Sequence, residues 1–179
     1  MFYRTNYSSP FGIITLACCN DNIIGLWFEN QKYFGGTVSK EMLEKNDLEI
    51  FKLAKNWLDR YFAGENPSIS EIPLAPRGNE FSQTVWKILC EIPYGEVTTY
   101  GEIANKIAKQ RGMEKMSAQA VGGAVGHNPV SIIIPCHRVV GKNGSLTGYA
   151  GGIKTKIKLL ELEKVNMTKF FVPKNSIEH

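Results

Sequence analysis

Apolar residues in the first part of the chain follow two different periods. The runs 12–18 and 23–28 are rich in β-branched and apolar residues and flank a turn-forming cluster at 20–22, so they predict a β-hairpin. Between about residues 48 and 62, large apolar residues recur instead at spacings of three and four. This second pattern predicts an amphipathic helix that stops at Gly64.

The second part of the chain carries several short helical patterns. The stretch 66–76, with three prolines and little periodicity, is interpreted as the linker that precedes them. One helical run begins near Asn79, and another begins after Thr99, which forms a capping-box pattern with Glu102. Ser117 is suited to cap a third. The last two helices make a helix-turn-helix candidate, although many helical pairs share this spacing.

Small residues dominate the helix predicted over 118–125. Each glycine in a helix costs about 1 kcal/mol relative to alanine, so such a composition needs another reason. A helix with little bulk lets a second surface approach closely, either a packed helix or a nucleic-acid groove. The sequence alone favours internal packing. The small residues are Ala118, Ala120, Gly122, Gly123 and Ala124.

A short apolar run at 130–134 is predicted as a buried strand that stops at Pro135. Cys136 and His137 follow directly. Reactive side chains often occupy such strand ends, and a cysteine nucleophile needs a base or positive surroundings to form its thiolate. A bare Cys-His pair is more often a buried cysteine beside a surface histidine, so this spacing leaves the role of Cys136 open.

Length and composition describe an ordinary globular chain. It has 179 residues, 43% of them hydrophobic, and no apolar run approaches the roughly 20 residues of a membrane span. The first residues lack the pattern of a signal peptide, so we expect a cytoplasmic protein, nucleoid-associated if prokaryotic. Its four cysteines, of which none forms a C-x-x-C pair, indicate neither disulfides nor a zinc site. They are Cys18, Cys19, Cys90 and Cys136.

Charge is distributed unevenly along the chain. Residues 1–76 hold seven basic and nine acidic side chains, whereas 77–179 hold fourteen and eight. A polyanion partner fits the second part, and the first part is not favoured as a nucleic-acid surface; an ordinary solvated face is the alternative. In the helix predicted over 153–164, Lys154, Lys156 and Lys158 are interpreted as solvated, with phosphate contacts as the alternative.

Several separate motifs, in the right order, resemble the O6-alkylguanine-DNA alkyltransferase family. The run Pro135-Cys136-His137-Arg138 is similar to the family's active-site motif, and Asn128-Pro129 lies at the family's spacing upstream. The glycine-rich loop 148–152 and the segment 92–100 also resemble family motifs. The similarity is close over about 81–163 and holds only in outline for 1–76.

The resemblance implies an α/β protein with two domains. Residues 1–76, linker included, would form a small ribonuclease-H-like α/β domain. Residues 77–165 would form a mainly helical domain of winged-helix or helix-turn-helix type that binds DNA and carries the catalytic residues. Independently of the resemblance, residues 166–179 contain Pro173 and few periodic apolar residues, so composition predicts a loosely held tail. The resemblance further implies a monomer without metal or organic cofactor.

The activity implied by the resemblance is a single, irreversible transfer of an alkyl group from DNA to Cys136. The substrate would be O6-alkylguanine in double-stranded DNA, with O4-alkylthymine as a second candidate lesion, flipped out of the helix so that the cysteine reaches it. His137 would take the thiol proton through a water, and Glu163 would orient His137. Asn128 would hold the turn and the water, and Tyr100 would donate to the leaving base.

The family pattern also implies residues that hold the base and the DNA. The carbonyls of Cys136 and Val139 and the amide of Ala150 would read the guanine edge. Tyr149 and Arg138 are grouped with them, Arg138 chiefly as a brace for the site's loops. Gln119 stands where the family usually has an arginine that fills the gap left by the flipped base. The DNA-binding set is Thr99, Gln119, Ala120, Gly122 and Gly123.

Two other functions compete with alkyl transfer. A DNA-binding sensor would grip the lesion without removing it, but the related sensor proteins lack the cysteine that this chain has. A cysteine hydrolase would use Cys136, His137 and Glu163 for acyl transfer and turn over many substrates. The mass of the protein after reaction separates these functions, because only an alkyltransferase keeps the alkyl group.

Overall fold

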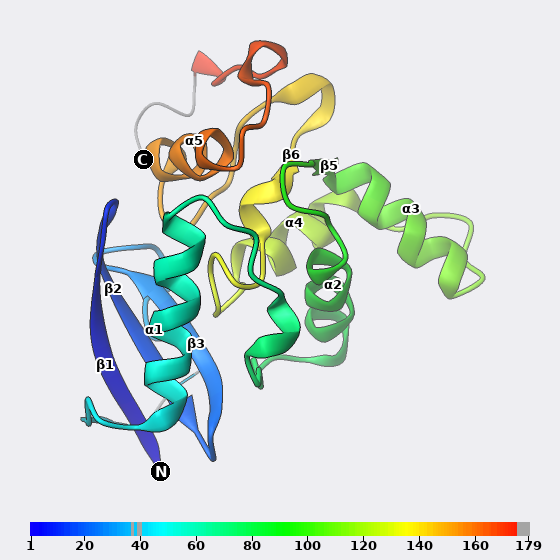
Figure 1. Cartoon of the computed structure of the whole chain (residues 1–179). Coiled ribbons are helices and arrows are strands. Elements are labelled where there is room, and N and C mark those ends of the chain that lie inside the picture. The colour runs from blue at the N-terminus through cyan, green and yellow to red at the C-terminus, as the bar shows by residue number, and fades with distance from the viewer. Residues whose placement is uncertain (37, 39–40, 175–179) are drawn as a thin grey trace.

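The N-terminal part of the chain forms a sheet with a helix against one face (Figure 1). The computed structural model describes residues 1–36, 38 and 41–174. Strands β1 (Phe2–Ser9), β2 (Gly12–Cys19) and β3 (Asn22–Phe28) are antiparallel neighbours, and β4 (Met42–Glu44) lies parallel to β1. The strand order is therefore β3-β2-β1-β4.

The predicted hairpin is confirmed as β2 and β3. Its turn residues Asn20 and Asp21 have φ values of 47° and 59°, which matches the tight turns whose twist suits a hairpin. Cys18 is buried and Cys19 is only half-buried, as alternation along a strand requires. The sequence did not predict β1 or β4, because neither shows a clear alternation of apolar and polar residues.

The predicted helix is confirmed as α1 (Glu49–Phe62). It lies across one face of the sheet (Figure 1), so its apolar stripe is removed from water. Gly64, just past its end, has a φ of 88°, a conformation that L side chains rarely adopt. The buried residues of the stripe are Ile50, Phe51, Ala54, Trp57, Leu58 and Tyr61.

The segment interpreted as a linker is bound to the sheet. The Ile23 amide donates to the Pro73 carbonyl at 2.8 Å, and the Ala75 amide donates to the Ile23 carbonyl at 2.9 Å. Ile72 is buried in the core. The chain therefore leaves the first part along the edge of β3, and the polar backbone of that edge is satisfied.

Helices dominate the rest of the molecule, and the predicted caps are confirmed. Thr99 and Glu102 form a reciprocal capping box, and Ser117 accepts a hydrogen bond from the Ala120 amide. Two short strands pair in parallel between the helices and the cysteine loop. The elements are α2 (Glu80–Cys90), β5 (Thr98–Thr99), α3 (Tyr100–Gln110), α4 (Ala118–Gly126), β6 (Val139–Val140) and α5 (Ile153–Leu162).

The strand predicted over 130–134 is wrong. The residues are buried as expected, but they form a tight turn in which the Ile134 amide donates to the Val130 carbonyl at 3.0 Å. Ile132 has a φ of 70°, a strained value for a β-branched residue. The apolar composition predicted burial correctly, but hydrogen bonds of the Asn128 side chain, described below, determine the conformation of the backbone.

The two parts of the chain share one hydrophobic core. The Leu26 amide of β3 donates to the Pro129 carbonyl at 2.8 Å, and the Ser131 amide donates to the Leu26 carbonyl at 3.2 Å. The same cluster of buried side chains contains members of the sheet, α1, α2, α3 and α4. Within the described residues, no helix has both the length and the apolar character needed to cross a bilayer.

Candidate active site

Asn128 fixes the loop that carries Cys136. Its side-chain amide donates to the Ile134 carbonyl at 2.8 Å, and its side-chain oxygen accepts from the Val130 amide at 3.0 Å. The next residues, Cys136–Arg138, form one turn of 3-10 helix. The chain is therefore not extended here, whereas on an extended strand Cys136 and His137 would point to opposite sides.

His137 and Glu163 form a fully buried pair. His137 Nε2 lies 2.5 Å from Glu163 Oε2, and neither side chain is exposed to solvent. Burial lowers the pKa of His137, although Glu163 opposes this effect. The imidazole is therefore neutral at pH 7, and its single proton lies on Nε2, where the carboxylate accepts it. Nδ1, which has no hydrogen-bond partner among the described residues, is the free acceptor.

Glu163 is the centre of the buried network. Its Oε2 accepts from the Tyr61 hydroxyl at 2.6 Å, and its Oε1 accepts from Arg138 Nε at 2.8 Å and from the Gly95 amide at 3.0 Å. Burial by itself would raise the pKa of Glu163, but His137 and Arg138 outweigh it and lower that pKa to about 2. The carboxylate is thus ionised, and it lies one residue beyond α5.

Tyr61 is a member of this network that the sequence did not reveal. Its ring lies on the buried stripe of α1 and stacks on Trp57 with the centroids 5.6 Å apart, so helical periodicity already accounted for it. A buried tyrosine hydroxyl nevertheless needs a partner, and that requirement was the one available signal. Through its bond to Glu163, the N-terminal part of the chain orients the His137 pair.

Arg138 connects separate loops of the site through its side chain. The side chain is buried, and its guanidinium donates to the Ile92 carbonyl at 2.7 Å as well as to Glu163. It thereby ties the segment that begins at residue 92 to the end of α5. Its donors are engaged by the protein itself, so it holds the loops together.

The interpretation of Lys156 as solvated is wrong. Its side chain is fully buried, and Nζ donates to the Val139 carbonyl at 2.5 Å and to the Thr147 carbonyl at 3.1 Å. Burial lowers its pKa to about 8. Lys154 and Lys158, by contrast, are exposed. The loops that precede α5 offer two carbonyls on its inner face, and these hold an ammonium group there.

The Cys136 thiol is a buried and weakly acidic group at rest. Its residue is 6% exposed, and burial raises its pKa, while the Asn128 side chain and the Lys156 charge act in the opposite direction. The thiol therefore needs a proton acceptor before it reacts. Tyr149, a neighbour in the Cys136 environment, is also buried, and its hydroxyl has no partner among the described residues.

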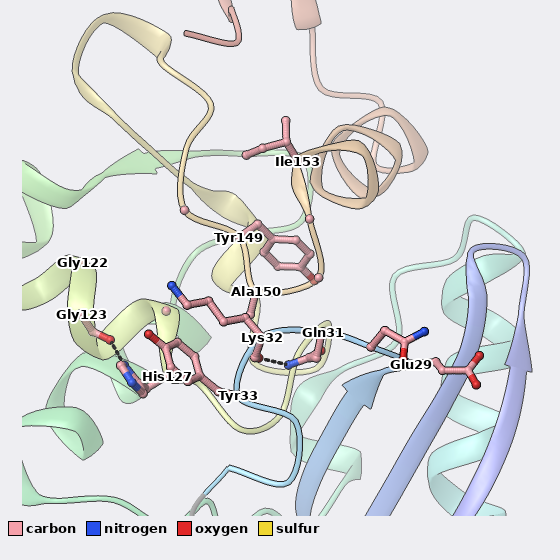
Figure 2. Close-up of a pocket in the computed structure, with 15 residues that line it drawn as sticks. Glu29, Gln31, Lys32, Tyr33, Gly122, Gly123, His127, Tyr149, Ala150 and Ile153 are labelled. Carbon is pink, nitrogen blue, oxygen red and sulfur yellow. Dashed lines mark hydrogen bonds between the residues drawn. The ribbon is translucent and has the colours of Figure 1, made fainter. Parts of the chain in front are cut away.

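Two hollows border α4. The larger, of about 840 Å³, is lined by α4, the loop 148–152 and residues 29–33 (Figure 2). Tyr149 and Ala150, two predicted substrate-binding residues, line it. The smaller hollow is lined by Thr99, Tyr100, Gln119 and Gly122, among others. The structure thus gathers most of the predicted DNA-binding residues around one helix.

Tyr100 is a hydrogen-bond donor, whereas most of the predicted DNA-binding residues on α4 are exposed. The Tyr100 hydroxyl donates to the Thr147 carbonyl at 3.2 Å, and burial raises its pKa to about 12, so it keeps its proton at neutral pH. Gln119, Ala120 and Gly123 are exposed on α4. The Thr99 hydroxyl serves as the cap of α3. Among the residues that the structure describes, no three His, Cys, Asp or Glu side chains gather as metal ligands do.

Two family models match nearly the whole chain. The model described as 6-O-methylguanine DNA methyltransferase, ribonuclease-like domain, matches residues 2–76, and the DNA binding domain of the same family matches 80–165. A solved O6-methylguanine methyltransferase from Mycobacterium tuberculosis superimposes with a TM-score of 0.77 at 43% identity, over 92% of this chain and 93% of that one. These matches confirm the predicted α/β fold with a helical C-terminal domain.

Several relatives share one name. A methylated-DNA–protein-cysteine methyltransferase from Haemophilus influenzae is 42% identical over 91% of this chain and 87% of its own length. One from Methanosarcina acetivorans is 43% identical over 90% of this chain and 97% of its own. The OGT protein of M. tuberculosis, solved in complex with DNA, matches with a TM-score of 0.79 at 42% identity, over 90% of this chain and 92% of that one. The chain therefore belongs to the 6-O-methylguanine DNA methyltransferase family.

Proposed function

We propose that this protein repairs O6-alkylguanine in double-stranded DNA by moving the alkyl group onto Cys136. The observation that carries the proposal is the buried His137–Glu163 pair, which lies next in sequence to the buried Cys136 thiol and leaves Nδ1 of a neutral histidine without a partner among the described residues. Family membership supplies the substrate class. An alkyl acceptor acts once, so the thioether that forms ends the activity of that molecule.

The proposed reaction balances within these residues. His137 Nδ1 takes the thiol proton, directly or through a water, and the Cys136 sulfur attacks the alkyl carbon. The sulfur–carbon bond forms while the bond from that carbon to O6 breaks, and its electron pair stays on the guanine. The leaving base takes up the proton that the thiol lost. Tyr100, protonated at neutral pH, donates a hydrogen bond to that base.

The loops that Lys156 links form the walls of the proposed base pocket. The carbonyls of Val139 and Thr147 accept from the same ammonium group, which ties the two loops together. We assign the carbonyls of Cys136 and Val139 and the amide of Ala150 to the guanine edge, as the family's motifs imply. A carbonyl has two lone pairs, so the Val139 oxygen still has one available for a base.

The mass of the intact protein tests the proposed function. After incubation with a duplex that carries one O6-methylguanine, the protein should gain the mass of one methylene group, once per molecule. The Cys136→Ala variant should gain nothing. Repeated turnover without a mass gain would indicate a hydrolase, and tight binding of an unchanged duplex would indicate a sensor. Either result would contradict alkyl transfer.

Gln119 offers a second prediction. It is exposed near the start of α4, and its amide can hydrogen-bond an orphaned base but carries no charge. The Gln119→Arg variant should bind duplex DNA more tightly and repair it several-fold faster, because a cation close to the phosphates adds to affinity. Single-turnover rates at fixed salt measure this, with Glu114→Gln, another exposed position, as the control. Unchanged rate and affinity would refute the assignment.

A further inference from the structure

The larger hollow beside α4 has one wall that belongs to the N-terminal part of the chain. Residues 29–33 follow β3 and face the glycines of α4 and the loop 148–152 (Figure 2). The Lys32 amide donates to the Ala150 carbonyl at 3.1 Å, which joins this wall directly to the cysteine side of the molecule. The segment is therefore part of the surface around α4, although the N-terminal part as a whole is acidic.

Side-chain contacts hold this wall in place. The Tyr33 and His127 rings stack with centroids 4.0 Å apart, and His127 Nδ1 donates to the Gly123 carbonyl at 2.7 Å. At the base of the segment, the Phe28 amide donates to the Gln31 side-chain oxygen at 2.8 Å. These contacts hold the residues on both sides of Lys32, whose exposed side chain lines the hollow.

Lys32 brings a positive charge into the hollow. Its ammonium lies 5.1 Å from the centroid of the Tyr33 ring, and Figure 2 shows the side chain extending toward the helix that carries Gly122 and Gly123. The carboxylate of Glu29, the acidic residue of this lining, lies at the opposite end of the hollow (Figure 2). In the described part of the chain, no ion pair engages Lys32.

The two hollows share Gly122 and Gly148; the smaller borders the N-terminal part of α4, and the larger borders its C-terminal part. A helix that enters a groove of DNA has one phosphodiester backbone on each side. The smaller hollow has Lys142 in its lining, and the larger has Lys32. Each hollow thus has one lysine beside the helix, within the region that the backbones of a bound duplex would border.

We propose that Lys32, held by the Tyr33–His127 stack, contacts a phosphate of the bound duplex, so that the N-terminal part of the chain contributes to the DNA-binding surface. This inference rests on the proposed function. A lysine contact to a phosphate carries no sequence information and releases a counterion, so its loss weakens binding of every duplex and reduces the dependence of affinity on salt.

Duplex affinity as a function of salt tests the proposal. Lys32→Gln should weaken binding of an undamaged duplex about fivefold near 0.1 M salt and reduce the slope of log K against log salt by about 1. Lys45→Gln is the matched control, because Lys45 also lies in the N-terminal part, 5.5 Å from the centroid of a tyrosine ring, and does not line either hollow. The control should bind as the wild type does.

Three outcomes overturn the proposal. If Lys32→Gln shows the wild-type dependence of affinity on salt, Lys32 does not contact a phosphate. Alkyl transfer to Cys136 would be unaffected by that result, since the mass gain is measured separately. An equal loss of duplex affinity in Lys45→Gln would show that the effect comes from net charge and not from a specific contact. A wild-type protein that neither binds duplex nor gains mass would refute the proposed function and this inference together.

Discussion

Replacing Glu163 by glutamine should reduce the free energy of unfolding by about 3–5 kcal/mol, the usual cost of removing one partner from a buried ion pair. The Arg138 guanidinium would stay buried without its counter-charge, and the variant's amide group would face donors from Tyr61 and His137. The repair rate should fall about 100-fold or more, because the proton on His137 Nε2 loses its acceptor. Urea unfolding and single-turnover kinetics measure the two effects.

The pH dependence of stability separates this effect from a general loss of packing. The folded pKa of Glu163 is about 2 and its unfolded value is near 4.3, so the carboxylate stabilises the fold above pH 4.3. That contribution, about 3 kcal/mol, is lost as pH falls from 4.3 toward 2. Glu163→Gln should lack this loss. Glu161→Gln, a change to an exposed carboxylate two residues earlier, should keep it, and equal acid profiles for the two variants would contradict the prediction.

Replacing Lys156 by methionine should slow repair by about tenfold to a hundredfold. The Val139 and Thr147 carbonyls would lose their shared donor, and each unpaired buried carbonyl costs about 1–3 kcal/mol, so the two walls of the proposed pocket would separate. Lys154→Met, a change to an exposed lysine of the same helix, should leave the rate unchanged. An active Lys156→Met protein would show that the ammonium is not needed to hold the pocket.

The change of the free energy of unfolding with pH above pH 7 gives a second test of the burial of the Lys156 ammonium. Its folded pKa is about 8, whereas the unfolded value is near 10.4, so between these values the unfolded chain binds more protons. The free energy of unfolding of the wild type should therefore rise relative to Lys156→Met by about 1 kcal/mol per pH unit in this window. Parallel curves for the two proteins from pH 8 to 10 would contradict a buried ammonium.

Local patterns predicted much of the fold because the interactions that decide it are close in sequence. The Thr99 capping box and the β2–β3 hairpin depend on residues within one turn, and both form as predicted. The strand at 130–134 failed for the opposite reason. Apolar composition indicates burial, but the Asn128 side chain supplies hydrogen bonds that a neighbouring strand would otherwise supply.

The candidate site was predicted through its resemblance to a family more than through local pattern. Cys136 and His137 are neighbours, but nothing in the spacing of Glu163 says that it reaches them. Lys156 and Tyr61 show the limit most clearly. The burial of a lysine depends on carbonyls from two separate loops, and the Tyr61 partner lies 102 residues away.

The convergence of donors on Glu163 has a consequence for inheritance. Tyr61, Gly95, His137 and Arg138 come from different parts of the chain and meet at one carboxylate. Groups that share a hydrogen-bond network do not respond to substitution independently. Loss of the Tyr61 hydroxyl lowers stability as long as Glu163 accepts its hydrogen bond. In a variant that already lacks the carboxylate, the same loss changes stability little. Variation at these positions is therefore epistatic, and lineages should change them together or leave them alone.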